Sequence, residues 1–65
     1  MLGNNLKVAC ASRNIMFKEL AEKIGVTAPQ LSLWAKGANA PSVKYALAIA
    51  KALDYKVEDL FYIKN

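Results

Sequence analysis

The stretch Phe17–Lys36, FKELAEKIGVTAPQLSLWAK, constrains the fold more than any other part of this 65-residue chain. Its apolar residues recur at helical spacing before and after Gly25-Val26-Thr27, which predicts two short amphipathic helices joined by a turn. Ala21 is small where the second helix would cross the first, so the two backbones can approach closely. Gly25 suits the left-handed position that ends a helix and permits a sharp reversal. The stretch therefore predicts two crossed helices.

The second helix of this pair has a strong start signal. Thr27 followed three residues later by Gln30 matches the capping-box pattern. Pro29 is tolerated there because the first helical turn has no use for its N–H. Leu31 and Trp34, spaced i, i+3, are expected to anchor the helix on the rest of the chain. In a helix-turn-helix, the second helix enters the major groove of DNA, so the motif predicts a DNA-binding protein.

The whole chain predicts an all-α fold with five helices in a single domain, 1–65. The expected helices run over about 5–13, 17–24, 27–36, 42–53 and 57–61, with short breaks and no internal repeat. The residues expected to point inward are Leu6, Ala9, Cys10, Leu20, Ala21, Ile24, Leu31, Trp34, Ala46, Leu47, Ile49, Ala50, Leu53, Leu60 and Phe61. Residues 61–63 have an alternative as a short strand, paired with 1–4 or with another chain.

Composition argues against catalysis and against a metal site. The chain has no His, which removes common zinc ligands and most routes to acid–base catalysis. Its single Cys10 cannot form an internal disulfide, and it lies in an apolar helical pattern typical of a buried thiol. We therefore expect no enzyme, no catalytic residue, no metal and no cofactor.

No apolar run reaches membrane-spanning length and the N-terminus lacks a signal-peptide pattern, so a cytoplasmic protein is expected.

The net charge of +4 and a sequence pI near 9.4 suit a polyanionic partner, although the signal is modest. The apolar fraction of 55% is high for such a small chain, and the C-terminal residues Phe61, Tyr62 and Ile63 offer more apolar area than a small core needs. These three residues are the expected dimer interface.

The chain resembles the Cro/CI-type (XRE-type) helix-turn-helix proteins over nearly its whole length. The residues that carry the resemblance are Leu20-Ala21, Gly25-Val26-Thr27, Leu31, Trp34, Gly37, Pro41-Ser42, Ala46-Leu47, Ile49-Ala50-Lys51-Ala52-Leu53 and Leu60-Phe61. The resemblance implies a lambda-repressor-like domain that binds a pseudo-palindromic DNA operator as a homodimer, usually as a repressor of phage, plasmid or bacterial genes. Its two recognition helices would lie about 34 Å apart. It implies no membrane and no small-molecule ligand as partner. It also implies a location at the bacterial nucleoid.

The candidate DNA-binding residues are Lys18, Thr27, Ala28, Pro29, Gln30, Ser32, Leu33, Lys36, Asn39 and Lys44. Gln30 could read adenine through its amide or complete the capping box. Ser32 could bind a phosphate or be a solvated helix residue, and Lys36 could bind a phosphate or complement the helix C-terminus. Ala28 and Leu33 could touch thymine methyl groups or form an apolar patch for a protein partner.

Several positions depart from the family pattern. Met16 and Phe17 stand where relatives carry a Thr or Ser cap followed by a phosphate-contacting Gln. Cys10 and Ala35 stand where many relatives carry a buried Arg–Glu pair, and loss of both charges together leaves none stranded. Leu33 replaces a frequent Arg. These departures motivate an alternative function, a protein-interaction module of the same fold, such as an antirepressor or assembly factor, with weak or no DNA binding.

Overall fold

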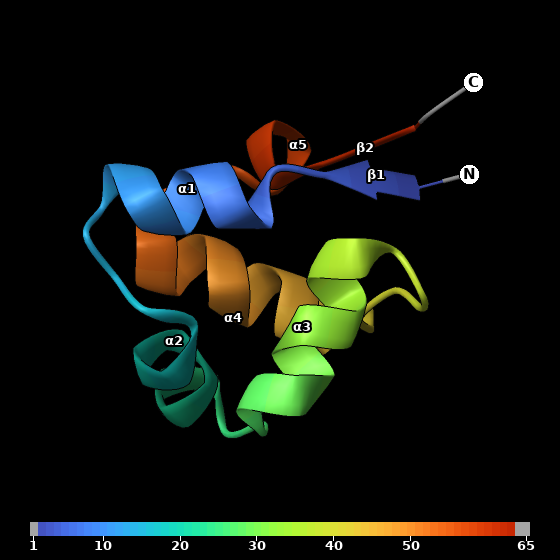
Figure 1. The fold of residues 1–65 in the computed structure, drawn as a ribbon. Coiled ribbons are helices and arrows are strands. Elements are labelled where there is room, and N and C mark those ends of the chain that lie inside the picture. The colour runs from blue at the N-terminus through green and yellow to red at the C-terminus, as the bar shows by residue number, and fades with distance from the viewer. Residues whose placement is uncertain (1, 64–65) are drawn as a thin grey trace.

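A computed structural model describes residues 2–63, which form five helices and two short strands (Figure 1). In chain order the elements are β1 Leu2–Asn4, α1 Leu6–Ser12, α2 Phe17–Ile24, α3 Ala28–Lys36, α4 Val43–Leu53, α5 Val57–Leu60 and β2 Phe61–Ile63. The five predicted helices are confirmed, with bounds that agree to within one residue. Met1, Lys64 and Asn65, which belong to the predicted domain, lie outside the described residues. No helix within 2–63 is long and apolar enough to cross a bilayer.

The two ends of the described chain form an antiparallel pair of strands, side by side in Figure 1. Asn4 lies opposite Phe61 in this ladder, and Gly3 lies opposite Tyr62. The ring of Tyr62 occupies the space that a Cβ atom on Gly3 would need. The strand alternative for 61–63, paired with the chain's own N-terminal segment, is therefore confirmed, and α5 ends at Leu60.

Every helix contributes a side chain to one apolar core. The largest fully buried side chains are Leu6, Leu20, Leu31, Ile49, Leu53 and Leu60. Burying a side chain of this size contributes roughly 1.5–3 kcal/mol, so these residues dominate the folding free energy. Cys10 is buried as predicted, and removal from water raises the pKa of its thiol.

The prediction that Leu47 points inward is wrong, because this side chain is 55% exposed. Successive residues of an α-helix are about 100° apart, so Leu47 is rotated well away from its neighbour Ala46, which packs against the core. The buried face of α4 is formed by Ile49, Ala50 and Leu53. Leu47 instead lies one turn after Val43, which is also exposed.

Candidate nucleic-acid interface

Local sequence signals fix the turn between α2 and α3. Gly25 adopts the left-handed conformation (φ 81°, ψ 31°), and its N–H donates to the carbonyl of Ala21 at 2.9 Å. Two residues later, the Thr27 hydroxyl accepts the N–H of Gln30 at 3.2 Å, so α3 begins at Ala28. These bonds end one helix and start the next within three residues, which forces the sharp change of direction visible in Figure 1.

The inner face of α3 is held by two buried residues, as predicted. Leu31 has no exposed surface and Trp34 is 6% exposed. The Trp34 ring also packs against Tyr45 of α4, with ring centroids 5.5 Å apart and a tilt of 39°. Contacts of this kind restrain α3 against rotation about its axis. The outer face of α3 is therefore presented in a fixed orientation.

None of the candidate DNA-binding residues is buried. Those classed as exposed are Lys18, Thr27, Pro29, Leu33, Lys36, Asn39 and Lys44, and those half-buried are Ala28, Gln30 and Ser32. The most apolar of the exposed group, Leu33, still shows 41% of its surface. The candidates are thus accessible to a partner.

Three of these candidates meet in one groove of about 580 Å³ between the start of α3 and the loop that leads to α4. Thr27, Gln30 and Asn39 line it, and the Gln30 amide nitrogen approaches the Asn39 side-chain oxygen at 3.5 Å. The Gln30 side chain therefore points to Asn39 and not back to the Thr27 backbone. Only the Thr27 half of the predicted capping box is formed.

The groove also contains two polar residues that sequence reasoning missed, Ser42 and Tyr45. Both follow Pro41 at the start of α4. The sequence signal that could have found them is that a second helix was predicted to start close to the recognition helix.

Other candidates lie outside the groove lining: Lys18 is on α2, and Lys36 is in the last turn of α3. Lys44 is in the first turn of α4, with its ammonium 5.5 Å from the Tyr45 ring centroid. The structure therefore distributes the candidate lysines over three helices.

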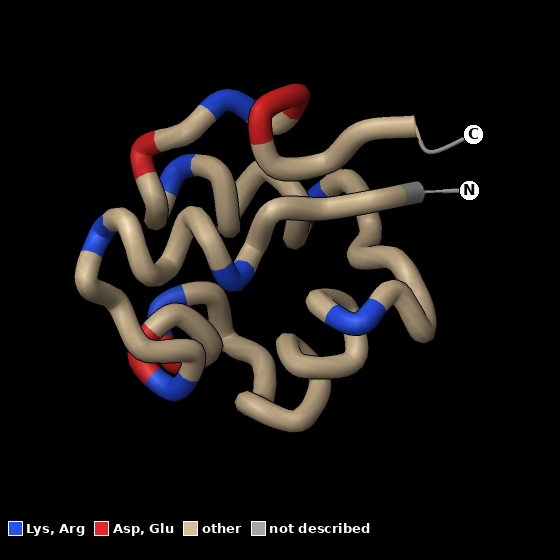
Figure 2. Tube along the Cα trace, turned by 45° about the horizontal axis from the view of Figure 1, so that its top comes forward, with Lys and Arg blue, Asp and Glu red and all other residues tan. Residues whose placement is uncertain are grey.

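Acidic residues are absent from the part of the chain that forms α3 and α4. All five lie elsewhere: Glu19 and Glu22 on α2, and Asp54, Glu58 and Asp59 around α5. Figure 2 shows α3 with a blue segment and no red one. The segment 23–53 thus carries only positive charges, a sequence signal that the net charge alone does not reveal. Neither α3 nor α4 therefore carries a carboxylate that would repel a phosphate.

The start of α2 explains how the fold tolerates its departures from the family pattern. The Met16 N–H donates to the carboxylate of Glu19 at 3.3 Å, so the Glu19 half of a capping box is formed, although Met16 has no hydroxyl that could accept the Glu19 N–H. Phe17 is half-buried and packs against the core. It therefore anchors α2 by packing.

The capped, crossed pair α2–α3 on a bundle of helices defines a helix-turn-helix protein. A helix-turn-helix family model matches residues 14–60, and the chain belongs to this family, in its XRE-type branch. The chain is 40% identical over 62 residues to an uncharacterised HTH-type transcriptional regulator of Methanocaldococcus jannaschii, covering 95% of this chain and 94% of that protein. It is 34% identical, with the same coverage, to the uncharacterised HTH-type transcriptional regulator YgzD of Bacillus subtilis.

The fold is also similar to a solved structure. The crystal structure of a candidate DNA-binding protein from Bacteroides fragilis matches this chain with a TM-score of 0.87 and 26% sequence identity. The match covers 95% of this chain and the whole of that one. The overall fold is therefore shared with a chain of nearly equal length.

Proposed function

We propose that this protein is a sequence-specific DNA-binding transcriptional regulator in which α3 enters the major groove. The observation that carries the proposal is that α3 is capped at its start, anchored by Leu31 and Trp34, and free of acidic residues on its outer face. The major groove admits one α-helix, and a helix held from behind can present side chains to base edges. The names of the two curated relatives support the same function.

The roles proposed for individual residues follow from their chemistry and position. Gln30 is the candidate base reader, because its amide can pair with N6 and N7 of adenine. Its present contact with the Asn39 side chain is long, at 3.5 Å, so giving up this contact for one with a base costs little. Lys36 and Lys44, on neighbouring helices, are the candidate phosphate contacts.

Supporting contacts are proposed for the other candidates. Thr27, Ser32 and Asn39 supply hydroxyl or amide groups for the DNA backbone, as does the ammonium of Lys18. Ala28, Pro29 and Leu33 supply apolar contacts, which suit thymine methyl groups.

We further propose that the protein acts as a homodimer on a pseudo-palindromic site, where it represses transcription. Ile63 is 81% exposed and Tyr62 is 42% exposed, so β2 presents apolar area to a second copy. Phe61 is only 9% exposed and packs in the core of its own chain. The proposed dimer contacts are therefore Tyr62 and Ile63, with Phe61 supporting them from within.

One observation favours a second candidate function, an interaction module that binds a protein. The outer face of α3 carries a single charge, Lys36, beside the exposed apolar residues Pro29 and Leu33. A protein partner would use such a surface, whereas DNA binding must draw its electrostatic attraction from neighbouring elements as well.

Selection of the full chain against a pool of random DNA duplexes at low salt separates the two functions. The DNA-binding proposal expects enrichment of a related, pseudo-palindromic set of sequences. The Gln30→Ala variant should then relax the preference at one position in each half-site, at a cost of about 1–3 kcal/mol against the preferred base. Lys36→Ala should weaken binding to all sequences alike. The proposal fails if no sequence is enriched and no duplex is bound.

A further inference from the structure

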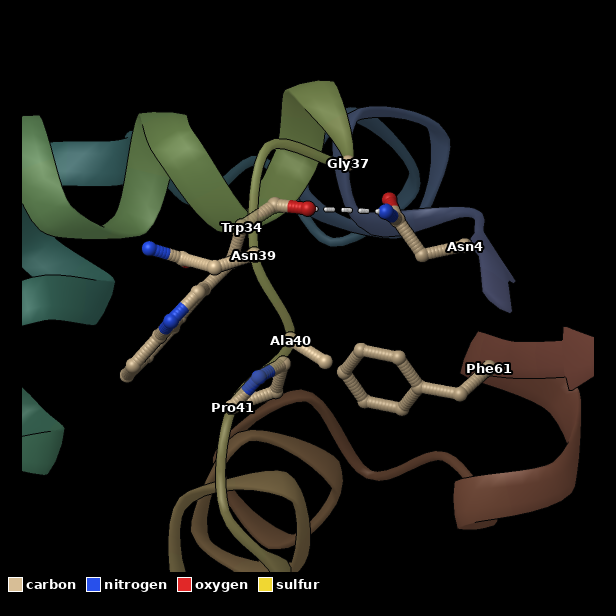
Figure 3. A pocket seen from close by; sticks show the side chains of 7 residues that line it. All are labelled: Asn4, Trp34, Gly37, Asn39, Ala40, Pro41 and Phe61. Atoms are coloured by element: carbon tan, nitrogen blue, oxygen red, sulfur yellow. Dashed lines mark hydrogen bonds between the residues drawn. The ribbon is translucent and has the colours of Figure 1, made fainter. Parts of the chain in front are cut away.

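Asn4, the last residue of β1, links the terminal sheet to the end of the recognition helix. Its side-chain amide nitrogen donates to the carbonyl oxygen of Trp34 at 2.9 Å and lies 3.4 Å from that of Ala35. Its side-chain oxygen accepts the N–H of Leu6 at 3.2 Å. Figure 3 shows the Asn4 amide directed at the Trp34 carbonyl. One half-buried side chain therefore joins β1, the start of α1 and the last turn of α3.

A cavity of about 180 Å³ lies beside this bond. Its walls include Trp34 of α3, Phe61 of β2, and Ala40 and Pro41 of the loop between α3 and α4. In Figure 3 the Phe61 ring faces Ala40 and Pro41 across this space. Close packing normally fixes the position of a helix, but here part of the space between α3 and the sheet is not filled by side chains. The last turn of α3 can therefore shift if the Asn4 bond is lost.

We infer that Asn4 is a positioning residue, which sets the angle at which α3 meets DNA. The inference rests on the proposed function of α3. The helix end that Asn4 holds also carries Lys36, the candidate phosphate contact, so a shift there moves a contact as well as the helix axis. Binding geometry tolerates errors of only about 0.5 Å, and a helix free to move at one end loses discrimination between sequences before it loses general affinity for phosphates.

The neighbouring Asn5 offers a matched control. Its side-chain amide also donates to a backbone carbonyl, that of Asp59 at 3.1 Å, but this bond ties the chain to α5 and not to α3. Asn4→Asp and Asn5→Asp each remove one amide donor and add one negative charge. Asn4→Asp also keeps an oxygen that can accept the N–H of Leu6. The two variants therefore differ in whether the recognition helix loses its link, and also in whether the added carboxylate lies beside the last carbonyls of α3 or beside α5.

The test measures the affinity of each folded variant for the selected DNA site and for random duplex of equal length. We expect Asn4→Asp to lower the ratio of these affinities about tenfold, which is within the range for residues that act on a binding site without touching the ligand, and Asn5→Asp to leave it within roughly twofold. If wild type shows no preference for any duplex, the proposed function itself fails. If wild type discriminates and both variants keep its ratio, only the role of Asn4 is overturned.

A second readout needs no DNA. Trp34 is the single Trp of the chain, and its carbonyl is the acceptor of the Asn4 bond. Its fluorescence emission should shift in Asn4→Asp and match wild type in Asn5→Asp. Equal emission from both variants would count against the inference. If Asn4→Asp does not fold, Asn4→Ala and Asn5→Ala, which add no charge, replace the pair in both measurements with the same expectations.

Discussion

The Arg13 side chain donates through Nε to the carbonyl oxygen of Leu53 at 2.9 Å, which joins the end of α1 to the end of α4. A second guanidinium nitrogen donates to the carbonyl of Asp54 at 3.0 Å, and the guanidinium carbon lies 4.5 Å from the centre of the Tyr55 ring. The last carbonyls of a helix lack partners within it, and a positive charge also complements their partial negative charge. Arg13 therefore caps α4 from another helix.

Replacement of Arg13 should destabilise the fold although its side chain is exposed. We expect Arg13→Ala to lower the free energy of unfolding by about 1–2 kcal/mol, because two charge-assisted hydrogen bonds are lost. Arg13→Lys should lose much of the same stability, since an ammonium cannot reproduce the planar fork. Urea unfolding measures both, with Lys7→Ala on α1 as the control. Equal stability of Arg13→Ala and Lys7→Ala would contradict the capping role.

Removal of the Thr27 hydroxyl should weaken the start of α3. Thr27→Ala loses the bond to the Gln30 N–H and should cost about 1 kcal/mol of folding stability. Thr27→Ser keeps an oxygen in reach of the same N–H and should leave the stability nearly unchanged. Chemical denaturation of the three proteins side by side makes the comparison. A Ser variant as unstable as the Ala variant would show that the hydroxyl bond is not the cause.

Cys10 should add a pH dependence at alkaline pH. Burial raises the pKa of its thiol in the folded state above the ordinary value of 9.0. Below that value both states keep the proton and the contribution of the thiol to stability is complete. As the pH rises from 9.0 through the folded pKa, the unfolded state releases its proton more readily, and this contribution is lost. The stability difference between wild type and Cys10→Ala should therefore shrink as the pH rises. A difference that stays constant to pH 11 would refute the expectation.

A charge on β2 should disrupt the proposed homodimer. Ile63→Lys places an ammonium on the surface offered to the second copy, so the variant should sediment as the 7.1 kDa monomer at concentrations where wild type is a dimer. Val8→Lys, at an exposed apolar position of α1, adds the same charge and should remain dimeric. Wild type that is monomeric at high concentration would remove the dimer proposal altogether.

The sequence was sufficient to predict features that depend on local chemistry. Gly25 and Gly37 mark the ends of α2 and α3, because glycine adopts at little cost the left-handed conformation that often ends a helix. Both have φ 81°. Thr27 marks the start of α3 by the same kind of local rule. The exposed position of Leu47 was not predicted, because alanines on several faces of α4 make its apolar stripe too broad to orient the helix.

The features that the sequence did not predict depend on contacts between distant segments. Arg13 reaches a carbonyl 40 residues away, and Asn4 reaches one 30 residues away. The residues next to each side chain in the sequence do not indicate this distant partner, although the Asn4 oxygen also makes a local bond to the Leu6 N–H. The strand at 61–63 was kept only as an alternative, because its pairing depends on the two chain ends meeting.

The salt dependence of DNA binding tests the central proposal most directly. The affinity for the selected duplex is measured from about 50 to 200 mM salt for wild type, Lys36→Ala and Lys56→Ala. Lys56 is the control because it precedes α5, among the acidic residues Asp54, Glu58 and Asp59. We predict that the slope of log affinity against log salt decreases in magnitude by about 1 per protomer, and so by about 2 for the dimer, in Lys36→Ala and is unchanged in Lys56→Ala. Binding that is independent of salt, or equal slopes for all three proteins, would contradict the placement of α3 on DNA.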